Sequence, residues 1–221
     1  MAGRSGSPTV VGVRDVPWWG VISSAATPVL LIGGWMVAAG LQPQPFDSVR
    51  QSVSALAGPG STDRWVMSLA FLVVAACYIT TALALRPAAM AGRLVLIAAG
   101  LAGVLVAASP QAAPGGFSLA HAFWSALGFA FLAAWPVAAR RPGLLVPWGL
   151  RPAMAVSASA VIIALLAWFL AELVTGGGQL GLAERVLGGA QALWPLLVVL
   201  SCRRSVAASR LSAGSGQLID I

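Results

Sequence analysis

The side chains that could do chemistry lie in three short segments, each between apolar stretches long enough to cross a membrane. Segment 42–64 carries hydroxyls, carboxylates and guanidiniums, segment 109–121 ends in the only histidine, and segment 172–185 contains a glycine run. Ionisable groups are costly at membrane depth, so they usually face a bundle interior or a wet cavity. We therefore predict eight ligand-binding residues: Arg50, Ser52, Ser54, Asp63, Arg64, His121, Glu184 and Arg185.

Some of these residues could support nucleophilic catalysis. Ser54 could act as the nucleophile, His121 as its base, and Asp63 or Glu184 as the carboxylate that orients the histidine. Such a relay is recognised by geometry, and nothing in the sequence spacing selects it. Ser54, His121 and Asp63 are therefore catalytic candidates only, and we commit to no catalytic residue.

Two of the candidate residues also have a purely structural interpretation, which is harder to apply to a third, Arg185. A lone histidine near a helix end, such as His121, often satisfies a neighbouring carbonyl or carboxylate. A carboxylate in the first turn of a helix, as expected for Glu184, is favoured by the helix dipole. Arg185 opposes the usual charge bias of membrane proteins and needs a partner, for which Glu184, Glu172, Asp63 or a lipid phosphate could serve.

The sequence predicts neither a metal site nor a cofactor. One histidine and the two cysteines, Cys77 and Cys202, do not supply the three or four ligands of a zinc site, and we expect both thiols to be free. The chain contains no phosphate-binding glycine loop with a lysine and no HExxH or GxSxG motif. Haem ligation would also require at least one more histidine.

The composition is that of a membrane protein. Of the 221 residues, 59% are hydrophobic and 9% are charged, and the mean hydropathy is +0.89. A soluble domain carries about 25% charged residues, so this chain lacks the polar surface of a water-solvated globule. These values exclude a soluble enzyme, a DNA-binding domain, a disulfide scaffold and a disordered chain. We therefore interpret the positive charge, formally +7, as a signal for the orientation of the chain in the membrane and not for a nucleic-acid partner.

Six apolar stretches predict an all-α polytopic bundle, because about 20 apolar residues are needed to cross the hydrocarbon core. A signal peptide is a weaker interpretation of the first stretch, which exceeds the roughly 7–15 residues of such a segment. We expect a short interfacial helix around residues 53–56 in the first outer loop, and close helix packing at Gly100, Gly103, Gly188 and Gly189. The predicted spans are 17–41, 65–85, 94–108, 119–139, 153–174 and 182–202, between flexible cytosolic ends at 1–16 and 203–221.

The arginines predict the orientation of the bundle. Cytoplasmic loops retain Arg and Lys, and an N-terminus inside the cell places ten of the thirteen arginines with two acids on the inner side. The outer side then holds three arginines and four acids. We therefore expect both termini inside, and the candidate site residues together at the outer end.

Several motifs resemble the DUF998 family of six-span bacterial membrane proteins, especially its actinobacterial members. They are Gln51-Ser-Val-Ser-Ala-Leu-Ala-Gly-Pro-Gly-Ser-Thr-Asp-Arg-Trp-Val-Met67, Ser109-Pro110, the helix start at His121, and Gly181-Leu-Ala-Glu-Arg185 followed by Trp194-Pro195. The resemblance covers residues 17–202 and implies a multi-pass protein of the bacterial inner membrane. Many relatives have Ser-Asp and Pro-Asp where this chain has Ser54-Ala55 and Pro110-Gln111, which weakens any acid–base mechanism inferred from the family. The resemblance implies no established activity.

These observations favour a noncatalytic membrane protein whose outward-facing pocket, between the fourth and sixth helices, binds a lipid headgroup or a small polar ligand. The alternatives are a membrane-embedded hydrolase acting on envelope lipids and a structural subunit of a membrane complex. A transporter is less attractive, because no span carries a charge at mid-depth. The expected partners are membrane lipids and, for an accessory protein, another membrane protein.

Overall fold

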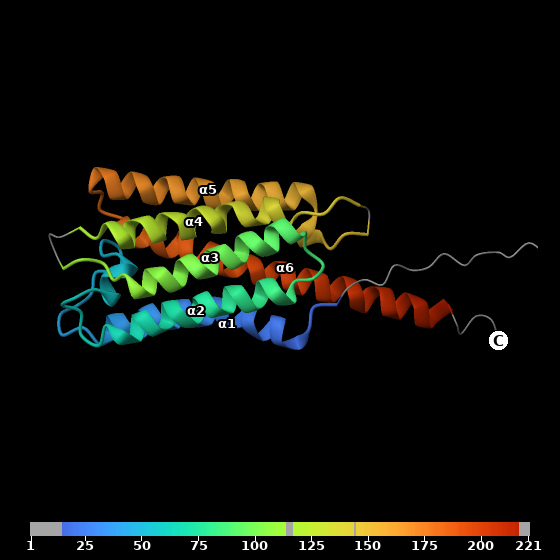
Figure 1. The fold of residues 1–221 in the computed structure, drawn as a ribbon, viewed down its shortest axis with the longest axis horizontal. Helices are drawn as coiled ribbons and strands as arrows, with labels where there is room; N and C mark the ends of the chain where they lie inside the picture. Colours follow the sequence, from blue (N-terminus) through green and yellow to red (C-terminus); the bar gives the residue numbers. More distant parts are fainter. Residues whose placement is uncertain (1–14, 114–116, 144, 217–221) are drawn as a thin grey trace, which may run out of the picture.

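The computed structural model describes residues 15–216, apart from 114–116 and 144, and the side chains up to residue 208. The described part is all helical, and six helices are long and apolar enough to cross a membrane (Figure 1). The predicted fold class is thereby confirmed. The helices are α1 Trp18–Gly40, η1 Val53–Ala57, α2 Trp65–Ala84, α3 Met90–Ala108, α4 Leu119–Ala139, η2 Trp148–Leu150, α5 Pro152–Thr175 and α6 Leu180–Gly216, where η marks a 3-10 helix.

Two helices extend beyond their predicted spans. α3 begins at Met90 instead of residue 94, because the Arg93 guanidinium donates to the carbonyls of Ala82 and Leu83 at the end of α2, at 2.8 and 3.1 Å. α6 continues past Cys202 to Gly216, where a flexible tail is expected. Alanine and arginine are strong helix formers, and no proline follows residue 202, so the helix has no local reason to end there. Residues 1–14 and 217–221 of the two expected flexible ends lie outside the described residues.

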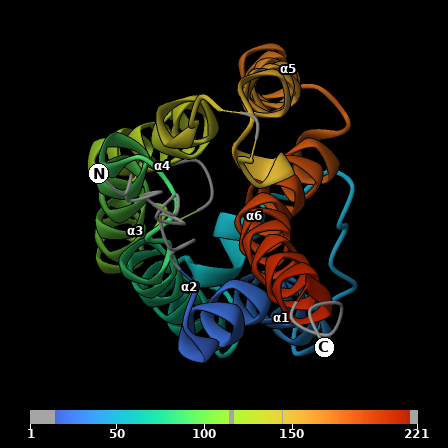
Figure 2. The same cartoon turned by 90° about the vertical axis from the view of Figure 1, so that its right-hand side faces the viewer.

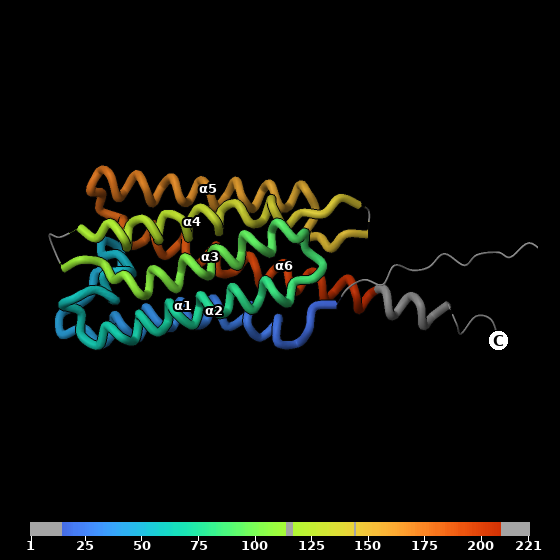
Figure 3. The backbone as a smooth tube through the Cα atoms, viewed as in Figure 1, coloured from blue at the N-terminus to red at the C-terminus, as the bar shows by residue number. Residues whose placement is uncertain are grey.

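The six long helices form a closed ring. Each one packs against the next in sequence, and α6 completes the ring by packing against α1, as the end-on view shows (Figure 2). The backbone trace runs back and forth between the two ends of the ring (Figure 3), so the start of α1 and the end of α6 lie at the same end. The assignment of that end to the cytosol stays a prediction.

Small residues let some of these helices approach closely. A Cβ at Gly100 on α3 would lie 2.8 Å from the Ala75 carbonyl oxygen on α2, and one at Gly103 would lie 3.1 Å from the Ala75 side chain. These contacts agree with the packing role predicted for both glycines. Gly188 and Gly189 differ, because a Cβ at Gly188 would make only an ordinary contact with Leu31, and one at Gly189 would meet nothing within 4 Å.

The first loop, residues 42–64, folds back onto the end of the ring. Its central 3-10 helix, η1, contacts α1, α2 and α6. Val53, Leu56 and Ala57 are buried, and they pack in a cluster with Met67 and Ala70 of α2. The apolar side of the segment is therefore packed against the bundle, and its position at a membrane interface stays a prediction. The segment is an inserted element that covers the interior of the ring, and we call this end of the bundle the η1 end.

Candidate ligand-binding cavity

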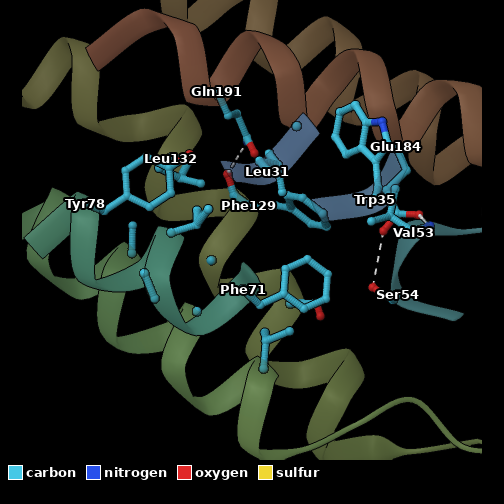
Figure 4. A pocket seen from close by; sticks show the side chains of 18 residues that line it. Leu31, Trp35, Val53, Ser54, Phe71, Tyr78, Phe129, Leu132, Glu184 and Gln191 are labelled. Atoms are coloured by element: carbon cyan, nitrogen blue, oxygen red, sulfur yellow. Dashed lines mark hydrogen bonds between the residues drawn. The ribbon is translucent and has the colours of Figure 1, made fainter. Parts of the chain in front are cut away.

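A cavity of about 120 Å³ lies inside the ring, next to η1. α1, α2, α3, α4 and α6 contribute its walls together with η1, whereas α5 contributes no lining residue. The pocket expected between the fourth and sixth helices is thus a partly open cavity that three further helices also line. Most of the lining is apolar or aromatic, and Figure 4 shows the principal side chains. The polar lining residues are Ser54, Tyr78, Ser125, Glu184 and Gln191.

Among the described residues that line the cavity, Glu184 is the only charged one. The residue is 8% exposed. Two residues of the first loop bind its carboxylate at the end of the cavity. The Val53 amide donates to Oε2 at 2.7 Å, and the Ser54 hydroxyl donates to Oε1 at 3.2 Å (Figure 4). Because α6 begins at Leu180, earlier than predicted, Glu184 lies beyond the first turn and does not cap its own helix. The carboxylate instead satisfies buried donors of a distant segment.

No described residue forms a close ion pair with this carboxylate, although Arg185 lies near enough to act on it electrostatically. Among the described residues, no arginine or histidine nitrogen lies within 4.0 Å of a Glu184 oxygen, and no cavity-lining residue is basic. Taking a charge out of water without a counter-charge costs several kcal/mol. The free acceptor capacity of Glu184 is therefore the strongest chemical feature of the cavity.

Arg185 points away from the cavity and holds the first loop. Its Nη1 atom donates to the carbonyls of Ser48, Gln51 and Gly181, at 2.7, 3.0 and 2.9 Å. Its guanidinium also lies 5.9 Å from the Trp35 ring centroid and 5.7 Å from that of Phe46. The partners of this arginine are thus backbone carbonyls and aromatic rings, and none of the carboxylates considered from the sequence pairs with it in the described structure.

Gly181 allows this contact between the first loop and α6. A Cβ at residue 181 would clash with the Gln51 carbonyl oxygen and would lie 2.8 Å from both the Ser48 carbonyl oxygen and Arg185 Nη1. One residue further on, the Leu182 amide donates to the Val49 carbonyl at 2.9 Å. The start of α6 therefore serves as a docking edge for the loop that covers the cavity.

The remaining charged candidates lie on the surface of the first loop. Arg50 is 74% exposed and forms a 3.9 Å ion pair with Asp47. Asp63 accepts a 3.2 Å hydrogen bond from the Trp65 indole, and Arg64 is exposed at the start of α2. None of the three predicted residues, Arg50, Asp63 and Arg64, lines the cavity. Ser52 is half-buried beside the Glu184 carboxylate.

His121 has its own structural partner. It is 9% exposed, and its Nδ1 lies 2.8 Å from the Ser109 carbonyl oxygen, across the connection between α3 and α4. The Ser118 hydroxyl caps the helix by accepting from the His121 amide at 3.3 Å. No hydrogen bond joins Ser54 to His121 in the described structure, because Ser54 donates to Glu184 instead. The geometry thus brings Ser54 and Glu184 together and leaves His121 apart from them.

The aromatic and amide residues of the wall were not identified from the sequence. Trp35, Phe71 and Phe129 resemble any other apolar residue of a span, and their periodicity does not reveal which of them face an interior space. Gln191 carried a usable signal, because a polar side chain in the middle of an apolar span usually faces a bundle interior. Its amide donates to the Phe129 carbonyl at 3.3 Å, and the side chain is 1% exposed.

Comparison with known proteins identifies the family but not a better-known relative. The family model described as "Protein of unknown function (DUF998)" matches residues 24–201, which include η1, the cavity residues and at least part of every long helix. No curated protein and no solved structure matches the chain. The family resemblance found in the sequence motifs is thereby confirmed.

Proposed function

We propose that this chain, which belongs to the DUF998 family, binds the polar end of a membrane lipid or a small polar molecule in the cavity beneath η1. The observation that supports the proposal is the position of Glu184. A buried carboxylate with spare acceptor capacity faces a largely apolar space inside a bundle whose helices are able to span a membrane. Ligand sites typically combine such apolar walls with a few convergent polar groups.

The size of the cavity limits what can enter. An apolar protein cavity of roughly 150 Å³ accommodates a molecule such as benzene. At about 120 Å³, this cavity accommodates one small molecule or one end of a larger one. A lipid would therefore place a single small group inside and leave its chains outside the ring.

The polar and apolar parts of the wall favour an amphipathic occupant. Ser54 and Glu184 lie at the end of the cavity that η1 covers, and the apolar residue Leu132 lies on the opposite side of the cavity (Figure 4). The first loop is held in place by Arg185, so we assign that residue to positioning the cover of the site and not to ligand contact. The binding residues in this proposal are Ser54 and Glu184, and Ser52, Arg50, Asp63, Arg64 and His121 lie outside the cavity wall.

The two alternative functions receive less support. A hydrolase that uses Ser54 with His121 would need the two side chains in contact, whereas each is hydrogen-bonded to another group. A purely structural subunit would explain the hydrogen bonds from Glu184 to the first loop, but it gives no role to the cavity that the carboxylate faces. We therefore favour binding over both.

A pair of neighbouring glycines provides the test. Gly188 lines the cavity, so Gly188→Leu would fill it, whereas Gly189 does not line it and a side chain there meets open space. Native mass spectrometry of the protein purified with its retained lipids should detect a bound molecule in the wild type and in Gly189→Leu, and loss of that molecule in Gly188→Leu. The mass of the molecule identifies it. Equal retention in the two variants, or no retained molecule in any of the three proteins, would contradict the proposal.

A further inference from the structure

We infer that the chemical group recognised in this cavity is an organic ammonium. This inference rests on the proposed function, and it adds the charge and the chemical class of the ligand. The juxtaposition that carries it is a buried carboxylate, Glu184, facing the same space as the aromatic side chains of Trp35, Phe71, Tyr78 and Phe129.

The first argument is charge. Buried charges in proteins are normally paired, whereas in the described structure Glu184 has no cation within ion-pair distance and Arg185, the nearby cation, is bonded to the carbonyls of the first loop. A ligand that carries one positive charge would supply the missing partner and leave the filled cavity electrically neutral. An anionic ligand would place a second negative charge beside the first.

The second argument is hydrogen bonding. An ionised carboxylate has about four acceptor positions, and the amide of Val53 and the hydroxyls of Ser52 and Ser54 occupy three of them. Gln191 directs its NH₂ group to the Phe129 carbonyl, so its own carbonyl oxygen remains an acceptor without a partner among the described residues. The cavity therefore offers acceptors to a ligand and lacks charged donors.

The third argument is the aromatic wall. The faces of aromatic rings attract cations, and a set of rings around a small cavity is the common way in which proteins bind quaternary ammonium groups. Four of the lining residues are aromatic, and they come from α1, α2 and α4, so they surround the space from different directions (Figure 4). An apolar wall of aliphatic side chains alone would not favour a cation in this way.

Arg185 does not create a competing anion site. Its Nη1 atom donates to three carbonyls, whereas its Nε and Nη2 atoms are buried by the surrounding residues and have no hydrogen-bond partner in the described structure. A phosphate could not reach these nitrogens without displacing the first loop. A ligand in the cavity can therefore contact the Glu184 carboxylate and the aromatic rings, but not the Arg185 guanidinium.

The probe pair is choline and 3,3-dimethylbutan-1-ol, which share a shape but differ in charge. Binding of each to the purified full-length protein would be measured by isothermal titration calorimetry. We expect wild type to prefer choline by about tenfold or more. Glu184→Gln keeps an oxygen for the Val53 amide but removes the charge, and it should reduce this preference to about twofold or less. The matched control is Glu172→Gln, which alters a carboxylate that lies outside the cavity and accepts from the Gln179 amide, and it should leave the preference unchanged.

A second arm of the experiment distinguishes a lipid from a free amine. The protein would be reconstituted in nanodiscs of phosphatidylglycerol alone, or with added phosphatidylcholine or phosphatidylethanolamine, before the choline titration. Weaker choline binding in the presence of either added lipid identifies a lipid headgroup as the source of the ammonium, and unchanged binding identifies a free amine.

The outcomes separate this inference from the proposed function. Equal binding of both probes, with Glu184→Gln indistinguishable from wild type, would overturn the ammonium assignment and leave a ligand-binding cavity. Binding of neither probe, together with a retained neutral or anionic molecule that Gly188→Leu loses, would have the same effect. If no molecule is retained and neither probe binds, both proposals fail.

Discussion

The Val53 amide donates a 2.7 Å hydrogen bond to Oε2 of Glu184, and this bond joins two residues that are 131 positions apart. It links the loop that covers the cavity to the helix that completes the ring. The same carboxylate oxygen pair therefore stabilises the fold and faces the space in which we place the ligand. The stability and the binding role of Glu184 can be separated by the choice of substitution.

Glu184→Ala should destabilise the protein more than Glu184→Gln does. The alanine variant leaves the buried Val53 amide without a partner, which costs about 1–3 kcal/mol, whereas glutamine retains an acceptor oxygen. Thermal unfolding of the detergent-solubilised variants would measure the difference. Equal melting temperatures for the alanine and glutamine variants would show that the hydrogen bond does not stabilise the fold.

Gly181→Ala should displace the first loop from the start of α6. The added methyl group would clash with the Gln51 carbonyl oxygen, and a clash of this kind typically costs about 1–3 kcal/mol. Gly189→Ala is the matched control on the same helix, because its Cβ meets nothing and alanine is the better helix former. Thermal unfolding should show a lower melting temperature for the first variant only. A fully stable Gly181→Ala protein would contradict the observed docking of the loop.

Arg185→Ala should loosen the first loop, because it removes three hydrogen bonds to backbone carbonyls. Hydrogen exchange of residues 47–57 should become faster, and less of the retained ligand should co-purify. The control is Arg50→Ala. Its exposed ion pair contributes about 0–1 kcal/mol, so exchange across the loop should stay close to that of the wild type. Unchanged hydrogen exchange in Arg185→Ala would show that this residue does not position the first loop.

His121→Ala should lower stability without changing ligand retention. The substitution removes the contact with the Ser109 carbonyl that ties the connection before α4, at a cost of about 1 kcal/mol. It leaves every cavity-lining residue in place. Thermal unfolding and native mass spectrometry of the same preparation provide the two measurements. Loss of the ligand at unchanged stability would instead place His121 in the binding site and revive the hydrolase alternative.

The orientation of the bundle is tested by cysteine labelling in intact cells. Thr62→Cys lies in the exposed part of the first loop, and Leu145→Cys lies in the connection at the opposite end, where Leu145 is 93% exposed. A membrane-impermeant maleimide should label the first variant before lysis and the second only after it. The wild type is the blank, because Cys77 is half-buried and Cys202 is buried. The reverse labelling pattern would invert the predicted topology.

The helices were predictable because the bilayer imposes a length on each apolar run. α1, α2, α4 and α5 agree with the predicted spans to within one residue at each end. The deviations arise where side chains override a simple pattern: Arg93 lies inside a helix because it can bond to the end of α2, and the residues after Cys202 continue α6. A hydropathy pattern treats an arginine as the end of a span, so it cannot show that the helix continues through that residue.

The site was predictable only in part. Ser54 and Glu184 were identified because polar groups beside apolar spans are conspicuous, and the structure brings them into contact. The sequence could not show that Arg185, the next residue along the helix, faces the loop and not the cavity, because that depends on the rotation of α6 within the ring. The aromatic wall could not be distinguished from lipid-facing aromatic residues for the same reason.

The closed ring also sets an order of events for the nascent protein. α6 supplies both Glu184 and the contact with α1 that completes the ring, and it is synthesised after the other five long helices of the described structure. Until it inserts, η1 has no carboxylate to accept from its first amide, and the interior is open to lipid on one side. The pocket thus forms only when α6 inserts, and a chain truncated before residue 180 would have the first five spans but no site.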